Sequence, residues 1–160
     1  MIFFPLTGAL PARAAQPSAV TASAGEFNVL NRDPLYETGW EVRFAPRRFL
    51  WLPRWVPPAS PTVGGMATSR GSLYAYAGFR FDRPLGERWM LSPQWATGLY
   101  YTDGGRSLGG ILEFRSGIEM SRRIGARARL GLLLYHISNA ALYSRNPGSE
   151  SLVLTYTASP

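Results

Sequence analysis

Three residues near the carboxyl end of the chain have side chains that could together hydrolyse an ester or an amide. His136 is the only histidine among 160 residues, Ser138 follows two positions later, and Glu150 lies beyond a short loop. In a β-strand, side chains two apart share a face at about 6.5 to 7 Å. A hairpin turning after Ser138 would bring Glu150 beside them. In a Ser-His-acid hydrolase, the serine attacks, the histidine takes its proton and the acid fixes the tautomer of the histidine.

The segments that carry these residues alternate apolar and polar side chains. The apolar face of 126–138 continues into His136 and Ser138, and Arg127 and Arg129 lie on the other face. After the loop, Glu150 shares its parity with three further apolar residues. All three candidate catalytic residues therefore extend an apolar face, whose other members are Leu130, Leu132, Leu134, Leu152, Leu154 and Tyr156.

The same two-residue period recurs upstream with the charges on the opposite face, as in Trp40, Val42 and Phe44 against Glu41 and Arg43. Apolar-out, polar-in alternation over roughly ten residues is typical of a transmembrane β-barrel, whereas a soluble lipocalin-like binder would invert it. The pattern predicts an all-β fold, an eight-stranded antiparallel transmembrane barrel. The expected strands are Val20–Leu30, Tyr36–Ala45, Thr62–Thr68, Gly71–Asp82, Trp89–Thr102, Leu108–Ser121, Ala126–Ser138 and Glu150–Thr157.

Composition narrows the class of protein. The chain is 46% hydrophobic with a mean hydropathy of -0.08. No stretch reaches the roughly 18 apolar residues that a membrane-spanning helix needs. The chain has no cysteine and one histidine, so neither a metal site nor a cofactor is indicated.

The net charge of +7 comes from arginines without any lysine. These arginines are scattered along the chain, which argues against nucleic-acid binding. Guanidinium groups also bind phosphate in a bidentate way, so the arginines in predicted loops beside the site are candidate contacts for anionic lipid head groups. They are Arg32, Arg70, Arg106 and Arg145.

The first fifteen residues are read as the remnant of an export signal, and residues 16–160 as a single barrel domain. With the amino terminus in the periplasm, the Asn139–Ser149 loop is extracellular, and the turns Arg83–Gly86 and Arg122–Gly125 are periplasmic. We expect Asn139–Ser149 to be the only long extracellular loop. Pro46–Pro61, rich in proline and tryptophan, fits the barrel pattern poorly; it could be a periplasmic excursion that touches the membrane surface or a partner interface.

Two motifs carry a resemblance to a known family. They are His-x-Ser-Asn-Ala at 136–140 and Asn-Pro-Gly-x-Glu at 146–150; Gly-Gly-Met-Ala-Thr at 64–68 and Glu-Phe-Arg-Ser-Gly at 113–117 extend the match. The sequence resembles the outer-membrane lipid A 3-O-deacylases of the PagL type. This resemblance implies hydrolysis of the 3-position acyl ester of lipid A, with Ser138 as nucleophile, His136 as general base and Glu150 orienting the histidine.

The resemblance further implies an oxyanion hole at the start of the loop, formed by Asn139, Ala140 and Asn146, with Gly148 shaping the turn. Ala141 stands where relatives carry glycine. The implied partners are lipopolysaccharide and outer-membrane lipids, and a homodimer is left open. The alternative is a non-catalytic small barrel that serves adhesion or envelope integrity. In that case His136 and Ser138 are interfacial groups, and Asn146-Pro147-Gly148 is an ordinary turn.

Overall fold

A computed structural model describes residues 17–31, 33, 35–50 and 53–160. The predicted export signal and Arg32 lie outside the described residues. Within this part of the chain no helix is long and apolar enough to cross a membrane. The described residues form nine strands: β1 Pro17–Phe27, β2 Leu35–Phe44, β3 Ala59–Thr68, β4 Leu73–Phe81, β5 Arg83–Leu85, β6 Trp89–Tyr101, β7 Leu112–Arg123, β8 Ala128–Ser138 and β9 Ser149–Ala158.

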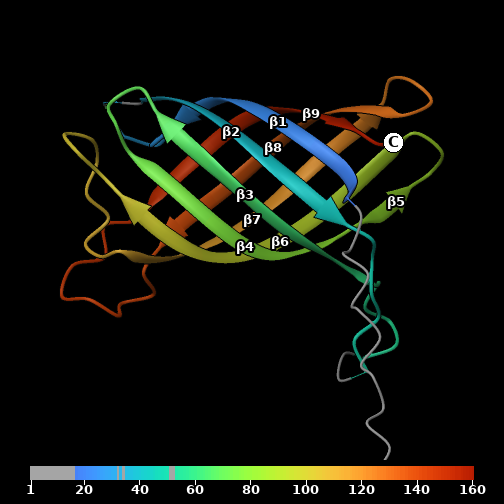
Figure 1. The fold of residues 1–160 in the computed structure, drawn as a ribbon, viewed down its shortest axis with the longest axis horizontal. Helices are drawn as coiled ribbons and strands as arrows, with labels where there is room; N and C mark the ends of the chain where they lie inside the picture. Colours follow the sequence, from blue (N-terminus) through green and yellow to red (C-terminus); the bar gives the residue numbers. More distant parts are fainter. Residues whose placement is uncertain (1–16, 32, 34, 51–52) are drawn as a thin grey trace, which may run out of the picture.

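The strands close into a barrel (Figure 1). The eight long strands each pair antiparallel with the next long strand along the chain, so β4 pairs with β6, and β1 pairs with β9. The three-residue β5 only extends this wall, because it pairs with the beginning of β6 at one rim. Eight strands therefore form the closed wall in the described residues, and the predicted barrel is confirmed. Closure pairs each of these eight strands on both sides, as a membrane-spanning sheet requires.

The wall separates an apolar exterior from a largely polar interior. Leu154 on the outside is 60% exposed, whereas Glu119 on the inside is 1% exposed. Because neighbouring side chains of a strand point to opposite faces, the alternation in the sequence becomes a lipid-facing belt and a packed lumen. The predicted parity is thus confirmed. Members of the exposed belt include Trp95, Ile118, Met120, Leu130, Leu132, Leu134 and Leu152.

Paired charges occupy one half of the lumen. Arg80 Nη1 donates to Glu119 Oε2 at 2.9 Å, and Arg80 Nε donates to Asp82 Oδ1 at 2.9 Å. Arg43 Nη1 also contacts Asp82, at 3.1 Å. Because a buried charge without its partner is strongly destabilising, these pairs make the fold depend on every member of the network.

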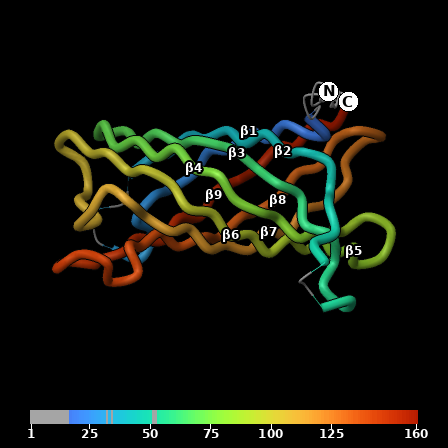
Figure 2. Tube along the Cα trace, turned by 60° about the horizontal axis from the view of Figure 1, so that its bottom comes forward, coloured from blue at the N-terminus to red at the C-terminus, as the bar shows by residue number. Residues whose placement is uncertain are grey.

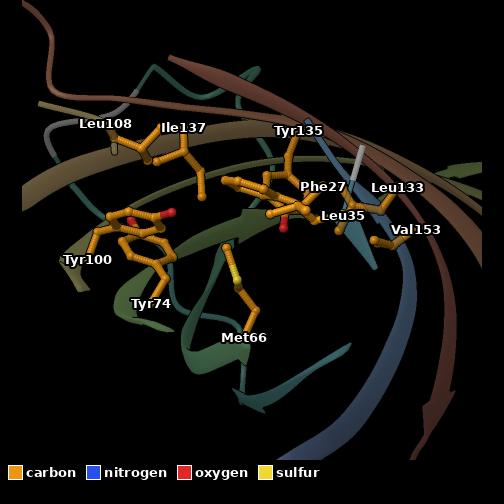
Figure 3. Packing of buried hydrophobic residues seen from close by; sticks show 10 residues of the cluster. All are labelled: Phe27, Leu35, Met66, Tyr74, Tyr100, Leu108, Leu133, Tyr135, Ile137 and Val153. Carbon is orange, nitrogen blue, oxygen red and sulfur yellow. The ribbon is translucent and has the colours of Figure 1, made fainter. Parts of the chain in front are cut away.

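Apolar and aromatic side chains gather in the other half of the lumen, near the loops that carry the candidate site, together with the buried Glu37, Glu113 and Arg115. Figure 3 shows this cluster, in which ten buried side chains gather inside the wall. Apolar packing here holds the loop-bearing ends of the strands at fixed positions. The cluster comprises Phe27, Leu35, Met66, Tyr74, Tyr100, Leu108, Leu133, Tyr135, Ile137 and Val153.

The two ends of the barrel differ in their connections (Figure 2). The site end carries segments 28–34, 69–72, 102–111 and 139–148; the turn end carries segments 45–58, 82–88 and 124–127. Segment 102–111 is as long as 139–148, so the prediction that only one loop at this end is long is wrong. The alternation in the sequence predicted that residues 108–111 begin a strand. Gly109 has a φ of 94°, which is incompatible with an extended strand, so these residues belong to the loop.

Two predicted turns are also corrected. Arg83–Leu85, predicted as a turn, is the short strand β5, since its backbone pairs with the first residues of β6. The strand β7 extends to Arg123, so the following turn begins at Ile124 rather than Arg122. Ala59–Pro61, read as part of the irregular segment, forms the beginning of β3.

Candidate active site

His136 and Glu150 face each other across two neighbouring strands. His136 of β8 is the register partner of Glu150 of β9. Their side chains point outward, and His136 Nδ1 lies 3.0 Å from Glu150 Oε1. The side chains are 43% and 31% exposed. An ionised carboxylate can only accept a hydrogen bond, so this contact favours the tautomer of His136 that carries the proton on Nδ1. In that tautomer Nε2 is the basic nitrogen.

Ser138 lies on the same outer face as His136, two residues nearer the rim. It is half-buried and pairs in register with Phe114 of β7. Within the described residues no hydrogen bond joins the Ser138 hydroxyl to the imidazole. Catalytic hydrogen bonds are often long without substrate and shorten only in the complex. The structure thus brings His136 and Glu150 into direct contact and places Ser138 beside them.

Gly148 lies against the imidazole. A Cβ atom built on Gly148 would stand 2.7 Å from His136 Cε1 and 3.3 Å from Nε2, so no larger residue fits without moving the ring. The φ of Gly148 is 61°, a conformation that glycine adopts without strain. Gly148 therefore shapes the turn, as the motif predicted, and also leaves space for the ring edge that bears Nε2.

Loop 102–111 braces loop 139–148. Arg106 donates to the carbonyl of Gly148 through Nε at 3.1 Å and Nη2 at 2.9 Å. Tyr100 in turn donates its hydroxyl proton to the carbonyl of Arg106 at 2.7 Å. The position of the glycine beside the imidazole thus depends on a residue 42 positions away. Arg106 was predicted from the sequence to be a head-group contact, and the local pattern contains no signal for this brace.

Asn139 is fully buried and holds the two loops together. Its backbone N–H donates to Asn146 Oδ1 at 3.0 Å, and its Nδ2 donates to the carbonyls of Leu108 and Arg145, both at 2.9 Å. Both nitrogens of Asn139 are therefore engaged in the loop structure. Of the predicted oxyanion donors, the backbone N–H of Ala140 and the amide nitrogen of Asn146 have no such bond among the described residues.

Ala140 and Ala141 both have left-handed backbone conformations, with φ values of 52° and 62°. Such values are unusual for residues with a Cβ atom. The glycine that the resemblance implies at position 141 would adopt this conformation without strain. The chain therefore turns sharply just after Ser138 and leads the loop back across the end of β8.

Ser116 was not among the site residues predicted from the sequence. This residue of β7 is exposed and is the register partner of His136, on the side opposite to Glu150. A hydroxyl that interrupts the outer apolar face of β7 was a signal available in the sequence. Residues directly opposite each other in antiparallel strands have Cβ atoms about 4.5 to 5.5 Å apart. Ser116 is therefore a second serine close enough to the imidazole to require a control in any test of the nucleophile.

Comparison with known protein families identifies a match over most of the chain. A family model for lipid A 3-O-deacylase (PagL) matches residues 36–159, the region that contains His136, Ser138 and Glu150. The chain belongs to the PagL family. Among curated proteins, none matches this chain.

Solved structures support the fold of this PagL-family chain. The crystal structure of the outer membrane enzyme PagL has a TM-score of 0.66 and 18% identity, covering 89% of this chain and 99% of that chain. Neisserial surface protein A (NspA) has a TM-score of 0.58 and 12% identity, covering 89% and 96%. A de novo designed transmembrane β-barrel has a TM-score of 0.52 and 12% identity, covering 91% and 98%. At these identities the likeness concerns the fold alone.

Membership of the PagL family and the closed barrel with its apolar belt locate the protein in the outer membrane. The candidate site of this PagL-family chain lies on the outer wall near one rim of that belt. A hollow of about 440 Å³ on the wall over β2, β3, β4 and β6 is not lined by any of the three residues.

The predicted head-group arginines lie at the site end of the barrel, apart from Arg32, which is outside the described residues. Arg70 and Arg106 line one hollow of about 380 Å³. Arg70 pairs with Asp33, and both side chains are more than half exposed. Arg145 is exposed in loop 139–148, and its carbonyl accepts from Asn139. The structure thus brings Arg70 and Arg106 together and leaves Arg145 apart from this hollow.

Proposed function

We propose that this protein hydrolyses the 3-position acyl ester of lipid A with a Ser138-His136-Glu150 triad. The observation that carries the proposal is the 3.0 Å contact between His136 Nδ1 and Glu150 Oε1 on the lipid-facing wall, with Ser138 beside it. An acid that fixes the tautomer of an exposed imidazole is what a serine nucleophile requires. The family consists of enzymes for this reaction, and the position of the triad suits an ester within a membrane.

The proposed reaction has two steps. Ser138 Oγ attacks the ester carbonyl while His136 Nε2 takes the hydroxyl proton, and Glu150 stabilises the resulting imidazolium. The tetrahedral intermediate collapses, the sugar oxygen leaves with the proton from His136, and the acyl group remains on Ser138. Water, deprotonated by His136, then attacks this acyl-enzyme and releases the 3-hydroxy fatty acid and the free serine.

The oxyanion of each tetrahedral intermediate needs hydrogen-bond donors. We assign this role to the backbone N–H of Ala140 and the amide nitrogen of Asn146, since Asn139 uses both of its nitrogens within the loop. One such donor contributes about 3 to 4 kcal/mol to the stabilisation of the transition state. Asn139 keeps its place in the site as the residue that fixes the loop from which Ala140 donates.

The outer wall holds the acyl chains of the substrate in this proposal. Chains of lipid A in the outer leaflet lie along the exposed leucines of β8 and β9, and the site end faces the exterior of the cell. The head group then lies over the loops, where Arg145 is exposed and where Arg70 and Arg106, which also bind Asp33 and the Gly148 carbonyl, line a hollow for its phosphates. The leucines are Leu130, Leu132, Leu134, Leu152 and Leu154.

The test compares serine variants by mass spectrometry of lipid A and of the released fatty acid. Ser138→Ala and His136→Ala should each reduce release about 10⁶-fold, since members of a triad act as a unit. Both variants should remain heat-modifiable barrels, because the side chains lie on the outer wall. Ser116→Ala is the matched control and should retain activity.

Two outcomes contradict this proposal. Activity that survives in Ser138→Ala and disappears in Ser116→Ala would make Ser116 the nucleophile. A wild-type protein that folds and leaves lipid A bearing a 3-O-acyl group unchanged would favour the non-catalytic barrel for adhesion or envelope integrity.

A further inference from the structure

Segment 45–58, which joins β2 to β3 at the turn end, has a composition unlike the other connections. It contains three arginines, no acidic residue, and several large apolar residues. Figures 1 and 2 both show it, in teal, hanging to one side of the barrel at this end rather than covering the lumen. Residues 51 and 52 lie outside the described residues.

The segment packs against the outside of the wall. The ring of Phe49 stands edge-on to that of Phe79 of β4, with centroids 5.3 Å apart. Phe79 shares its parity with the outward-facing Leu73 and Ala75. Val56 and Pro57 line a cleft of about 240 Å³ together with Phe81, Leu91 and Pro93, which belong to the same outer wall. The segment therefore covers a patch of the surface that faces lipid elsewhere around the barrel.

Local contacts close the segment into a loop. The backbone of Arg47 pairs with Ala59 through two hydrogen bonds of 2.8 and 2.9 Å. Arg48 donates to the carbonyl of Arg54 at 3.4 Å, and Val56 N–H donates to the carbonyl of Pro53 at 3.0 Å. This closure holds Leu50 and Trp55 outward, where they are 99% and 79% exposed.

We infer that segment 45–58 is a membrane-surface anchor that binds the phospholipids of the leaflet at the turn end. Its apolar contacts are continuous with the lipid-facing wall, so Leu50 and Trp55 stand beside the barrel at the depth where aromatic residues meet head groups. Arg47, Arg48 and Arg54 are exposed beside them and match anionic phosphates. In the orientation proposed above, this leaflet is the periplasmic one.

The anchor is separate from the chemistry of the site. It lies at the opposite end of the barrel from His136 and Ser138, and its contacts described above are with Phe79, Phe81, Leu91 and Pro93 of the wall. Its role is to fix the depth and tilt of the barrel in the membrane. Failure of this inference and failure of the proposed function are therefore distinguishable, because the lipid contact should persist in Ser138→Ala.

The absence of cysteine from the chain allows a single fluorescent label. Leu50→Cys, labelled with an environment-sensitive dye, would be studied as the full chain in nanodiscs of phosphatidylethanolamine and phosphatidylglycerol. Lipid-borne spin labels and aqueous iodide would serve as quenchers. Leu154→Cys on the belt is the lipid reference, and Glu87→Cys, exposed in a turn at the same end, is the aqueous reference.

We expect the lipid-borne spin labels to quench the dye at residue 50 nearly as strongly as the dye at residue 154. Iodide should quench the dye at residue 50 several-fold less than the dye at residue 87. Replacing Arg47, Arg48 and Arg54 together by glutamine should increase the iodide quenching of the dye at residue 50 in these discs. Iodide access at residue 50 equal to that at residue 87 would overturn the anchor and favour a surface for a soluble partner. Equal quenching with and without the arginines would overturn their assignment to phosphate.

Discussion

Two neighbouring register pairs of β8 and β9, called rungs below, place polar side chains on opposite sides of one wall. Tyr135 and Ser151 are register partners that point into the lumen, where both donate hydrogen bonds to Glu37. The next rung, His136 and Glu150, points outward to the lipid. Each rung brings a carboxylate to a hydrogen-bond donor, but the surroundings of the two carboxylates differ.

The difference shows how the side of the wall determines the role of a polar group. Glu37 is 3% exposed, so its hydrogen bonds compensate for the loss of water and stabilise the barrel. The side chain of Glu150 is 31% exposed, and it is not needed to fill the wall. Substitutions in the inner rung should therefore change stability, and substitutions in the outer rung should change activity.

Among the substitutions that compare the two rungs, the largest effect on activity is expected from Glu150→Gln. The amide can donate to Nδ1 and so favour the wrong tautomer of His136, which should lower kcat about 10³- to 10⁴-fold, less than loss of Ser138. The free energy of unfolding in urea should stay near that of the wild type. Steady-state release of fatty acid from lipid A measures the first quantity. Full activity in this variant would remove Glu150 from the triad.

A smaller loss is expected from Gly148→Ala. The new Cβ would stand 2.7 Å from His136 Cε1, so the imidazole must shift, and kcat/KM should fall about 10- to 100-fold. Gly86→Ala is the matched control, since Gly86 has a φ of 71° and no atom would lie within 4 Å of its Cβ. Both variants place an alanine at a positive φ and so carry similar backbone strain. Only Gly148→Ala should lose activity, because only its Cβ meets the imidazole. Equal activity would mean that the ring tolerates displacement.

The smallest effect on activity is expected from Tyr135→Phe. Removing the hydroxyl leaves the buried Glu37 with one donor fewer, which should lower the free energy of unfolding by about 1 to 3 kcal/mol. Activity of the folded fraction should not change, although Tyr135 precedes His136. Tyr156→Phe, on the exposed outer face, should leave both quantities unchanged. A large loss of activity in Tyr135→Phe would contradict the separation of the two rungs.

Much of the barrel could be predicted because alternation is a local property. The apolar parity of Leu130 to Leu134 and of Leu152 to Tyr156 required only the two-residue period of a strand. The prediction was wrong where backbone conformation interrupts the pattern, as at Gly109, or where pairing extends a strand through a predicted turn, as at Arg83. The alternation of apolar and polar residues reveals neither the positive φ of a glycine nor the pairing partner of a strand.

Within the candidate site, the motif predicted the contact of His136 with Glu150 but not the support around it. The brace from Arg106 to Gly148 and the bonds from Asn139 to Leu108 connect loops far apart in the chain. Such contacts depend on the pairing of β7 with both β6 and β8, which brings the loops at the ends of these strands together. For this reason Arg106 was predicted as a candidate head-group contact and not as a brace for Gly148.

The amino-acid sequence by itself determined which side of the wall each residue faces, because adjacent residues of a strand must point in opposite directions. It also supplied the histidine, serine and glutamate of the candidate triad. Only the tertiary structure decided that His136 and Glu150 share a rung, since register follows from the pairing of β8 with β9 across the loop. It likewise decided that Ser116 lies beside the imidazole, because a neighbour on a third strand is set by the hydrogen-bonded ladder and not by distance along the chain.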